Sequence, residues 1–299
     1  MCGIVGLFLK SPELEKDLGA LLAPMLVEMT ERGPDSVGMA VYGEAAPAGT
    51  TKLTVLADSP DYAWEKLGVE LKSVFGDDSG LRVIENHGVL TVKDDPAILH
   101  GWLYTEHPEL SMNSSGNVIE IYKEKGIPAD FIRRFHVQDM QGTHALGHTR
   151  MATESAVTTK HSHPFSTGED LCLVHNGSLS NHNRLRKFLI NEGVQFQTDN
   201  DSEVAAGYLT WKMQNGATLD EALQSGFEDL DGFYTFAVGT RDGFAVVRDA
   251  IGAKPAILAE TDDWVAMASE FRAIATLPGV ENARIWEPDP EKIYSWHRS

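Results

Sequence analysis

The chain has 299 residues, 42% hydrophobic and 23% charged, which is enough to bury a substantial core as one large domain or two small ones. Its formal net charge of −19 disfavours nucleic acid and anionic membrane surfaces as partners, and no stretch approaches the roughly 20 apolar residues of a membrane span. Because two cysteines cannot form a disulfide framework and no signal-peptide pattern is present, we expect a cytoplasmic protein.

The N-terminal third begins with an apolar run that predicts a buried strand over residues 2–9. Ser11-Pro12-Glu13 then has the features of a helix start, and apolar residues at helical spacing extend the predicted helix to Met29. Pro24 lies inside this segment and predicts a kink or a division into two shorter helices. A second strand is expected at 37–42.

The region from about 51 to 145 gives a mixed signal. Its patterns favour a helix over 62–75, a loop at 112–116 and a strand at 118–122. It contains no chemical motif and no internal repeat.

The C-terminal half has clearer signals. A strand at 171–175 runs into Asn176-Gly177, which we interpret as a tight turn, and the acidic segment 198–203 predicts a helix start. Short strands follow at 233–239, 244–248, 256–259 and 265–269. Strand-rich ends with helices between them predict an α+β fold of antiparallel sheets covered by helices, and not a parallel βαβ array.

Cys2 is a candidate nucleophile because of its position. If the initiator Met1 is trimmed, Cys2 carries both a thiol and a free α-amine, whose ordinary pKa of about 8 suits a general base. If Met1 is retained, the thiol lacks this base. Judged on the N-terminus alone, an ordinary strand with an incidental cysteine is an equally good interpretation.

Other positions hold the residue types that amide hydrolysis needs. Asn176-Gly177 combines a side-chain amide with an unobstructed backbone N–H, as an oxyanion hole requires, although the dipeptide alone favours a hairpin turn. Arg150 can hold a carboxylate through two hydrogen bonds, but an isolated arginine is more often part of a surface ion pair. Asp201 can hold an ammonium group or simply cap the predicted helix.

Four histidines close together in sequence raise the alternative of a metal site: His148, His161, His163 and His175. Pro164 favours a loop there, and no carboxylate or second cysteine falls at a familiar ligand spacing, so we expect no metal. Cys172 lies inside an apolar strand and is expected to be an inert core residue.

Together these segments resemble the class II glutamine amidotransferases, the glutaminase domains of the N-terminal-nucleophile hydrolases. The matching segments occur in the family's order over most of the chain: 1–6, 32–36, 147–150, 174–181, 198–203, 230–238, 248–249 and 268–270. The resemblance implies a four-layer αββα sandwich with Cys2 at one end of a central strand.

The resemblance also implies a role for each candidate residue. Cys2 would attack the side-chain amide of L-glutamine, release ammonia and leave a thioester that water cleaves. Asn176 and the N–H of Gly177 would form the oxyanion hole. Arg150 would bind the α-carboxylate of glutamine and Asp201 its α-ammonium group.

The chain departs from compact family members in its length. We interpret residues 2–299 as one amidotransferase domain with a family-variable insertion at about 51–145. The phrase at 114–118 is similar to the glutaminase portion of glutamate-synthase-type proteins. The nearest similarity is to the glutaminase-like subunits of such complexes, including the one in N-methylglutamate synthase.

This similarity, and the absence of an acceptor-site domain after the last matched strands, implies partner subunits. We expect a hetero-oligomer with two further kinds of subunit, an FMN-binding synthase and one of the GXGXG type. No cofactor is expected on this chain; FMN, with an iron–sulfur cluster as a further option, would lie on the partners. The alternatives are a catalytically silent scaffold or regulatory subunit of the same complex, and an amidotransferase of another pathway.

Overall fold

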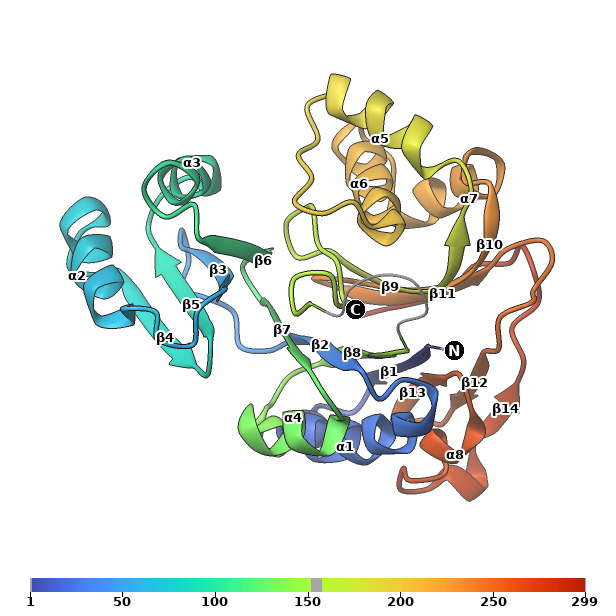
Figure 1. Cartoon of the computed structure of the whole chain (residues 1–299). Coiled ribbons are helices and arrows are strands. Elements are labelled where there is room, and N and C mark those ends of the chain that lie inside the picture. Colours follow the sequence, from blue (N-terminus) through green and yellow to red (C-terminus); the bar gives the residue numbers. More distant parts are fainter. Residues whose placement is uncertain (1, 152–157, 299) are drawn as a thin grey trace.

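Two antiparallel sheets lie face to face in the computed structural model, which describes residues 2–151 and 158–298 (Figure 1). The first sheet has the spatial order β14 (Arg284–Trp286), β12 (Ile257–Glu260), β13 (Trp264–Ala268), β1 (Gly3–Leu9), β8 (His144–Arg150), β2 (Ser36–Tyr42) and β7 (Ile119–Lys125). The second has the order β15 (Tyr294–His297), β11 (Gly243–Arg248), β10 (Gly232–Thr240) and β9 (Cys172–Leu179).

Helices cover the outer faces of both sheets (Figure 1). The face of the first sheet is covered by α1 (Leu18–Glu28), α4 (Pro128–Arg134) and α8 (Phe271–Ile274). The second sheet is covered by α5 (His182–Asn191), α6 (Asp201–Gln214) and α7 (Leu219–Asp229). The order helix, sheet, sheet, helix confirms the αββα sandwich that the family resemblance implies.

Strand β1 is an apolar run without alternation because both of its faces are covered. Val5 and Leu7 point to the helix layer, where they join the core made by α1, and Ile4 and Phe8 point into the core between the two sheets. Cys172 belongs to the same inter-sheet core, and its burial raises the thiol pKa to about 12, as expected for an inert residue.

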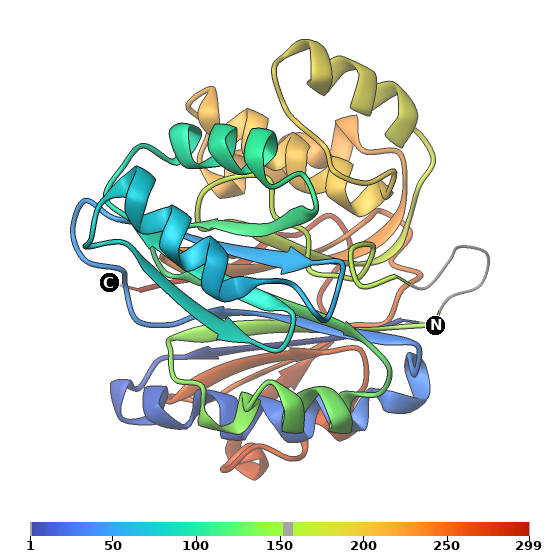
Figure 2. The same cartoon turned by 60° about the vertical axis from the view of Figure 1, so that its left-hand side comes forward.

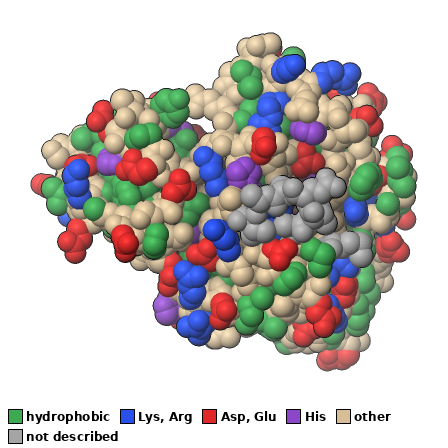
Figure 3. Space-filling model, viewed as in Figure 1, with side chains coloured by type: hydrophobic (Ala, Val, Ile, Leu, Met, Phe, Trp, Pro, Cys, Tyr) green, Lys and Arg blue, Asp and Glu red, His purple; other side chains and the backbone are tan. Residues whose placement is uncertain are grey.

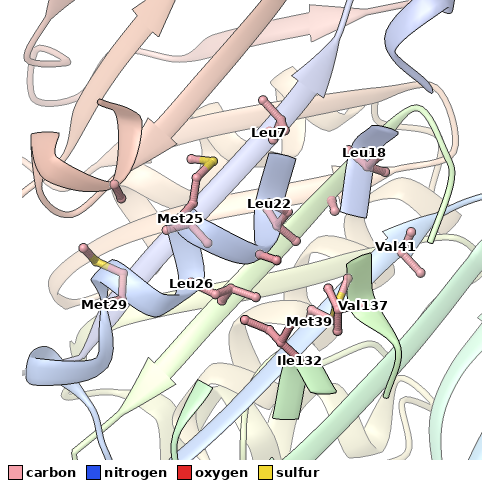
Figure 4. Packing of buried hydrophobic residues seen from close by; sticks show 14 of the residues in the cluster. Leu7, Leu18, Leu22, Met25, Leu26, Met29, Met39, Val41, Ile132 and Val137 are labelled. Carbon is pink, nitrogen blue, oxygen red and sulfur yellow. The ribbon is translucent and has the colours of Figure 1, made fainter. Parts of the chain in front are cut away.

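Helix α1 runs through Pro24 to Glu28, so the predicted division of the helix at Pro24 is wrong. The segment divides earlier, where the 3₁₀ turn at Pro12–Asp17 gives way to α1. Proline removes one backbone hydrogen bond, but the helix buries a row of side chains against β1 and β8 (Figure 4). These side chains are Leu18, Leu22, Met25 and Leu26.

A third sheet lies beside the sandwich and carries its own two helices (Figure 2). Its strand order is β4 (Gly80–Ile84), β5 (His87–Val92), β3 (Thr51–Ala57) and β6 (Leu110–Gly116), and its helices are α2 (Trp64–Phe75) and α3 (Pro96–Glu106). The loop predicted at 112–116 is therefore wrong, because β6 pairs with β3 along this stretch. Acidic, basic and hydrophobic side chains mix on the surface of this lobe (Figure 3).

The third sheet occupies the first part of the region expected to be an insertion. Strand β7, which also lies in that region, pairs with β2 and completes the edge of the first sheet. The carboxylate of Asp170 holds the connection between the third sheet and β7. It accepts hydrogen bonds from the backbone N–H groups of Asn117, Val118 and Ile119, which lead from β6 into β7. Whether the region varies within a family stays a prediction.

Candidate active site

Cys2 lies immediately before the central strand β1, and its side chain is partly exposed. Its carbonyl oxygen accepts two hydrogen bonds, from Arg32 Nε at 3.0 Å and from Asn176 Nδ2 at 3.2 Å. Two residues later, the Ile4 N–H donates to Ser269 Oγ at 2.9 Å. The start of β1 is thus fixed from three different parts of the chain.

Arg32 is a site residue to which the sequence assigned no role. Its guanidinium is buried, and its Nη1 forms an ion pair with Glu270 Oε1 at 2.8 Å. The hydrogen bond from Arg32 is the main reason that the pKa of the Glu270 carboxyl is lowered. The only signal in the sequence was the position of Arg32 at the head of the segment 32–36.

Asn176 and Gly177 lie inside strand β9 and not in a turn, so the predicted tight turn is wrong. The strand continues because both residues pair with β10, Asn176 opposite Thr235 and Gly177 opposite Tyr234. Only glycine fits at position 177, where φ is +153° and an added Cβ would lie 2.0 Å from the carbonyl oxygen of Phe233. The Asn176 amide has two N–H bonds, and one of them remains after the bond to Cys2.

Arg150 is the last residue of β8, at the same end of the sheet as Cys2. The register pairs Thr149 with Gly3, so Arg150 is the next residue along β8 beside Cys2, and on the other side it pairs with Ser36. The pKa of His148 is lowered to about 3, mainly by burial of its ring, and the positive charge of Arg150 is one of the further causes.

Asp201 is the first residue of α6, but it is not the cap of that helix. The cap is Asn200, whose side chain accepts a hydrogen bond from the Ser202 N–H at 2.8 Å. The Asp201 side chain is 22% exposed, and its Oδ2 accepts from the backbone N–H of Leu179 in β9 at 2.9 Å. The aspartate is therefore tied to the strand that carries Asn176 and Gly177.

Three of the four histidines considered for a metal, His148, His163 and His175, pack against one another. The rings of His148 and His163 stack 4.0 Å apart, and those of His163 and His175 lie 6.5 Å apart. His161 lies apart from them and faces Asp199 at 3.3 Å. Within 2–151 and 158–298, no group of three or more histidines, cysteines or carboxylates is placed to hold a metal ion.

The structure thus joins Cys2 directly to Asn176, joins Asp201 to the strand that carries Asn176 and Gly177, and places Arg150 beside Cys2 in register. A thiol, amide and backbone N–H donors, a cation and an anion together can bind an amino acid and cleave an amide. The expectation about Met1 lies outside the described residues.

Comparisons with known proteins identify the family of the chain. A family model described as a glutamine amidotransferase domain matches residues 148–276. The chain is 52% identical to the glutamine amidotransferase-like protein GlxB of Rhizobium meliloti, over 99% of this chain and 98% of that protein. It is 32% identical to a putative glutamine amidotransferase of Methanothermobacter thermautotrophicus, over 98% and 99% of the two chains.

A solved structure, the glutamine phosphoribosylpyrophosphate amidotransferase of B. subtilis, has the same fold, with a TM-score of 0.61 at 19% identity. The match covers 99% of this chain, which spans about half (49%) of that structure. The fold is thus that of the N-terminal-nucleophile hydrolases. With relatives this similar along their whole length, the chain belongs to the class II glutamine amidotransferases.

Proposed function

We propose that the chain hydrolyses the side-chain amide of L-glutamine, with Cys2 as nucleophile. The observation that carries this proposal is the 3.2 Å hydrogen bond from Asn176 Nδ2 to the Cys2 carbonyl oxygen, because it brings the donor predicted for the oxyanion next to the predicted thiol. The membership of the chain in the amidotransferase family supports the same chemistry.

In the proposed reaction, the α-amine of a trimmed Cys2 takes the thiol proton and the sulfur attacks the amide carbon. The developing oxyanion accepts hydrogen bonds from the second N–H of Asn176 and from the Gly177 backbone N–H. The proton passes to the leaving nitrogen, and ammonia departs. Water then cleaves the γ-glutamyl thioester and regenerates the thiol.

Two charged residues would select glutamine among amides. Arg150 binds the α-carboxylate, since a planar guanidinium matches a carboxylate with two parallel hydrogen bonds. Asp201 binds the α-ammonium group with the acceptor positions that Leu179 leaves open. Because one glutamine molecule must contact both Arg150 and Asp201, replacing either residue should raise KM for glutamine more than it lowers kcat.

We further propose that the ammonia passes to a partner in a glutamate synthase or N-methylglutamate synthase-like complex. The similarity of residues 114–118 to glutamate-synthase-type proteins supports this step. The proposed partners are an FMN-binding synthase and a GXGXG-type protein, and FMN and any iron–sulfur cluster would belong to them.

The test begins with the intact mass of the purified protein, which shows whether Met1 has been removed. With Met1 removed, the wild-type chain, alone or with its co-purified partners, should release glutamate and ammonia from glutamine. Cys2→Ala should abolish this release, and Cys172→Ala, a change at the buried core cysteine, should retain it.

Other results would point elsewhere. If protein from which Met1 has been removed releases no ammonia even in its complex, the glutaminase proposal is wrong. Retained Met1, together with normal complex function in a Cys2→Ser variant, identifies a silent scaffold. Purification as a lone chain without a flavoprotein partner favours an amidotransferase of another pathway.

A further inference from the structure

The hydroxyl of Ser202 lies where three side chains meet. Its Oγ is 2.8 Å from His163 Nε2, 2.9 Å from His175 Nδ1 and 3.2 Å from Asp201 Oδ1. Ser202 and both histidines are buried, with exposed fractions of 1%, 6% and 3%. A buried N–H or O–H group needs an acceptor within the protein. The direction of each hydrogen bond therefore follows from counting the protons on these groups.

Both histidines are neutral. Burial lowers the pKa of His175 to about 4 and that of His163 well below its ordinary value, so each ring carries one N–H. Their other ring nitrogens, His163 Nδ1 and His175 Nε2, are buried and have no hydrogen-bond partner among the residues that the structure describes.

A proton on either of those nitrogens would be a buried donor without an acceptor, which is the costlier kind of unsatisfied group. The N–H groups are therefore on His163 Nε2 and His175 Nδ1, and both donate to Ser202 Oγ. With its two lone pairs occupied, the hydroxyl has only its own proton to give. Among the residues that the structure describes, the acceptor within hydrogen-bond distance of this hydroxyl is Asp201 Oδ1.

We propose that Ser202 is a positioning residue for the substrate: its hydroxyl, oriented by His163 and His175, fixes the Asp201 carboxylate in the direction in which it binds the α-ammonium group of glutamine. This inference rests on the proposed function. With Leu179 N–H on Oδ2 and Ser202 O–H on Oδ1, each oxygen is held once and keeps an acceptor position for the substrate.

The same network reaches the oxyanion donors. His175 directly precedes Asn176, and its carbonyl oxygen accepts a hydrogen bond from His148 Nε2 at 3.1 Å. An added Cβ at Gly177 would lie 2.7 Å from His175 Nε2, so the imidazole of His175 also packs against Gly177. The part of the site that holds the ammonium group and the part that holds the oxyanion therefore share His175.

The kinetic test compares glutamine with glutaramate, the same amide without the α-amino group, on protein from which Met1 has been removed. In Ser202→Ala, kcat/KM for glutamine should fall about ten-fold or more, because a hydrogen bond to a charged group is lost, whereas kcat/KM for glutaramate should barely change. Ser202→Thr keeps a hydroxyl and should restore the preference. Ser166→Ala is the matched control, since within 2–151 and 158–298 that hydroxyl bonds only the Gly168 carbonyl.

An equal fall for both substrates in Ser202→Ala would show that the residue is only structural and would overturn the inference. Nitrogen-15 spectra of the wild-type histidines give a readout independent of turnover and of any variant's folding. They should show the proton on Nε2 of His163 and on Nδ1 of His175, and either opposite tautomer overturns the inference. If trimmed wild-type protein does not hydrolyse glutamine, the proposed function fails, and the tautomers still decide whether the hydrogen-bond order exists.

Discussion

Asn176 has two tasks in the proposed site. One N–H of its amide holds the Cys2 carbonyl, and the other is available to the oxyanion. Replacing an oxyanion donor typically lowers kcat about 10²- to 10³-fold, because its hydrogen bond strengthens only as charge develops. We therefore expect Asn176→Ala to lower kcat for glutamine hydrolysis by about this factor in steady-state assays, with a much smaller change in KM.

The matched control is Asn282→Ala, at an exposed residue whose side-chain amide donates a hydrogen bond to its neighbour Glu281. Its kcat should equal that of the wild type. A rise in KM with unchanged kcat in Asn176→Ala would instead mean that the amide binds the ground state and does not stabilise the oxyanion.

Lys123, on β7, is a buried cation that the proposed chemistry does not use. It is 3% exposed, its Nζ lies 4.7 Å from the centre of the Phe165 ring, and burial lowers its pKa to about 7. Since each unit of pKa shift corresponds to about 1.4 kcal/mol, the shift from 10.5 sets an upper bound of roughly 5 kcal/mol on the cost of keeping it charged. Lys123→Met should therefore stabilise the fold at pH 6.

The gain should depend on pH in a definite direction. The unfolded lysine keeps its proton up to about pH 10, whereas the folded one loses it above about pH 7, so the wild type gains stability as pH rises between these values. The advantage of Lys123→Met in urea unfolding should therefore shrink from pH 7 to 10. Lys66→Met, at a side chain that is 75% exposed, should change stability by less than about 0.5 kcal/mol at every pH.

At the scale of the elements, the parts of the site with strong local signals could be predicted from the sequence. The apolar run of β1, the strand before Asn176 and the acidic start of α6 place Cys2, Asn176 and Asp201 without knowledge of the fold. The contact between His163 and Ser202 could not be predicted, because it joins positions 39 residues apart and depends on how the loop that carries His163 packs against α6.

The third sheet was missed for a related reason. Strand β6 contains Asn113, Ser114 and Ser115, residue types that favour turns when only local preferences are considered. Its pairing with β3 overrides those preferences. The same competition explains Asn176-Gly177, where pairing with β10 makes a strand of a dipeptide that favours turns.

The third sheet gives a prediction about cooperativity. Leu90 of β5 is fully buried in the core shared by this sheet and its helices, and Leu90→Ala should cost about 2–5 kcal/mol. Because Asp170 and β7 link the lobe to the sandwich, we expect one thermal transition, shifted to lower temperature. Leu22→Ala, in the α1 core, is the comparison and should shift the same single transition. Two separate transitions in Leu90→Ala would show that the lobe unfolds independently.

For the whole molecule, acid sensitivity follows from buried histidines that lie in different parts of the fold. Burial is the largest cause in each case, and the pKa falls to about 3 or 4, or well below its ordinary value, at His87, His144, His148, His163 and His175. Their pKa in the unfolded chain is about 6.5. Between these values the unfolded chain binds protons that the folded chain does not, so stability is full above about pH 6.5 and falls as pH decreases.

Each such histidine removes roughly 2 kcal/mol by pH 5, so together they are comparable to the whole stability of an ordinary domain. Urea unfolding should show stability falling steeply between pH 6.5 and 5, above the range in which carboxylates titrate. His144→Gln isolates one contribution, because this ring lies outside the proposed site, stacked on Tyr42 and bonded to the Thr240 carbonyl. The variant loses some packing at every pH, but its stability should fall with a slope smaller by about 1.4 kcal/mol per pH unit. An unchanged slope would mean that His144 takes up a proton in the folded state, and that its burial does not exclude the charge.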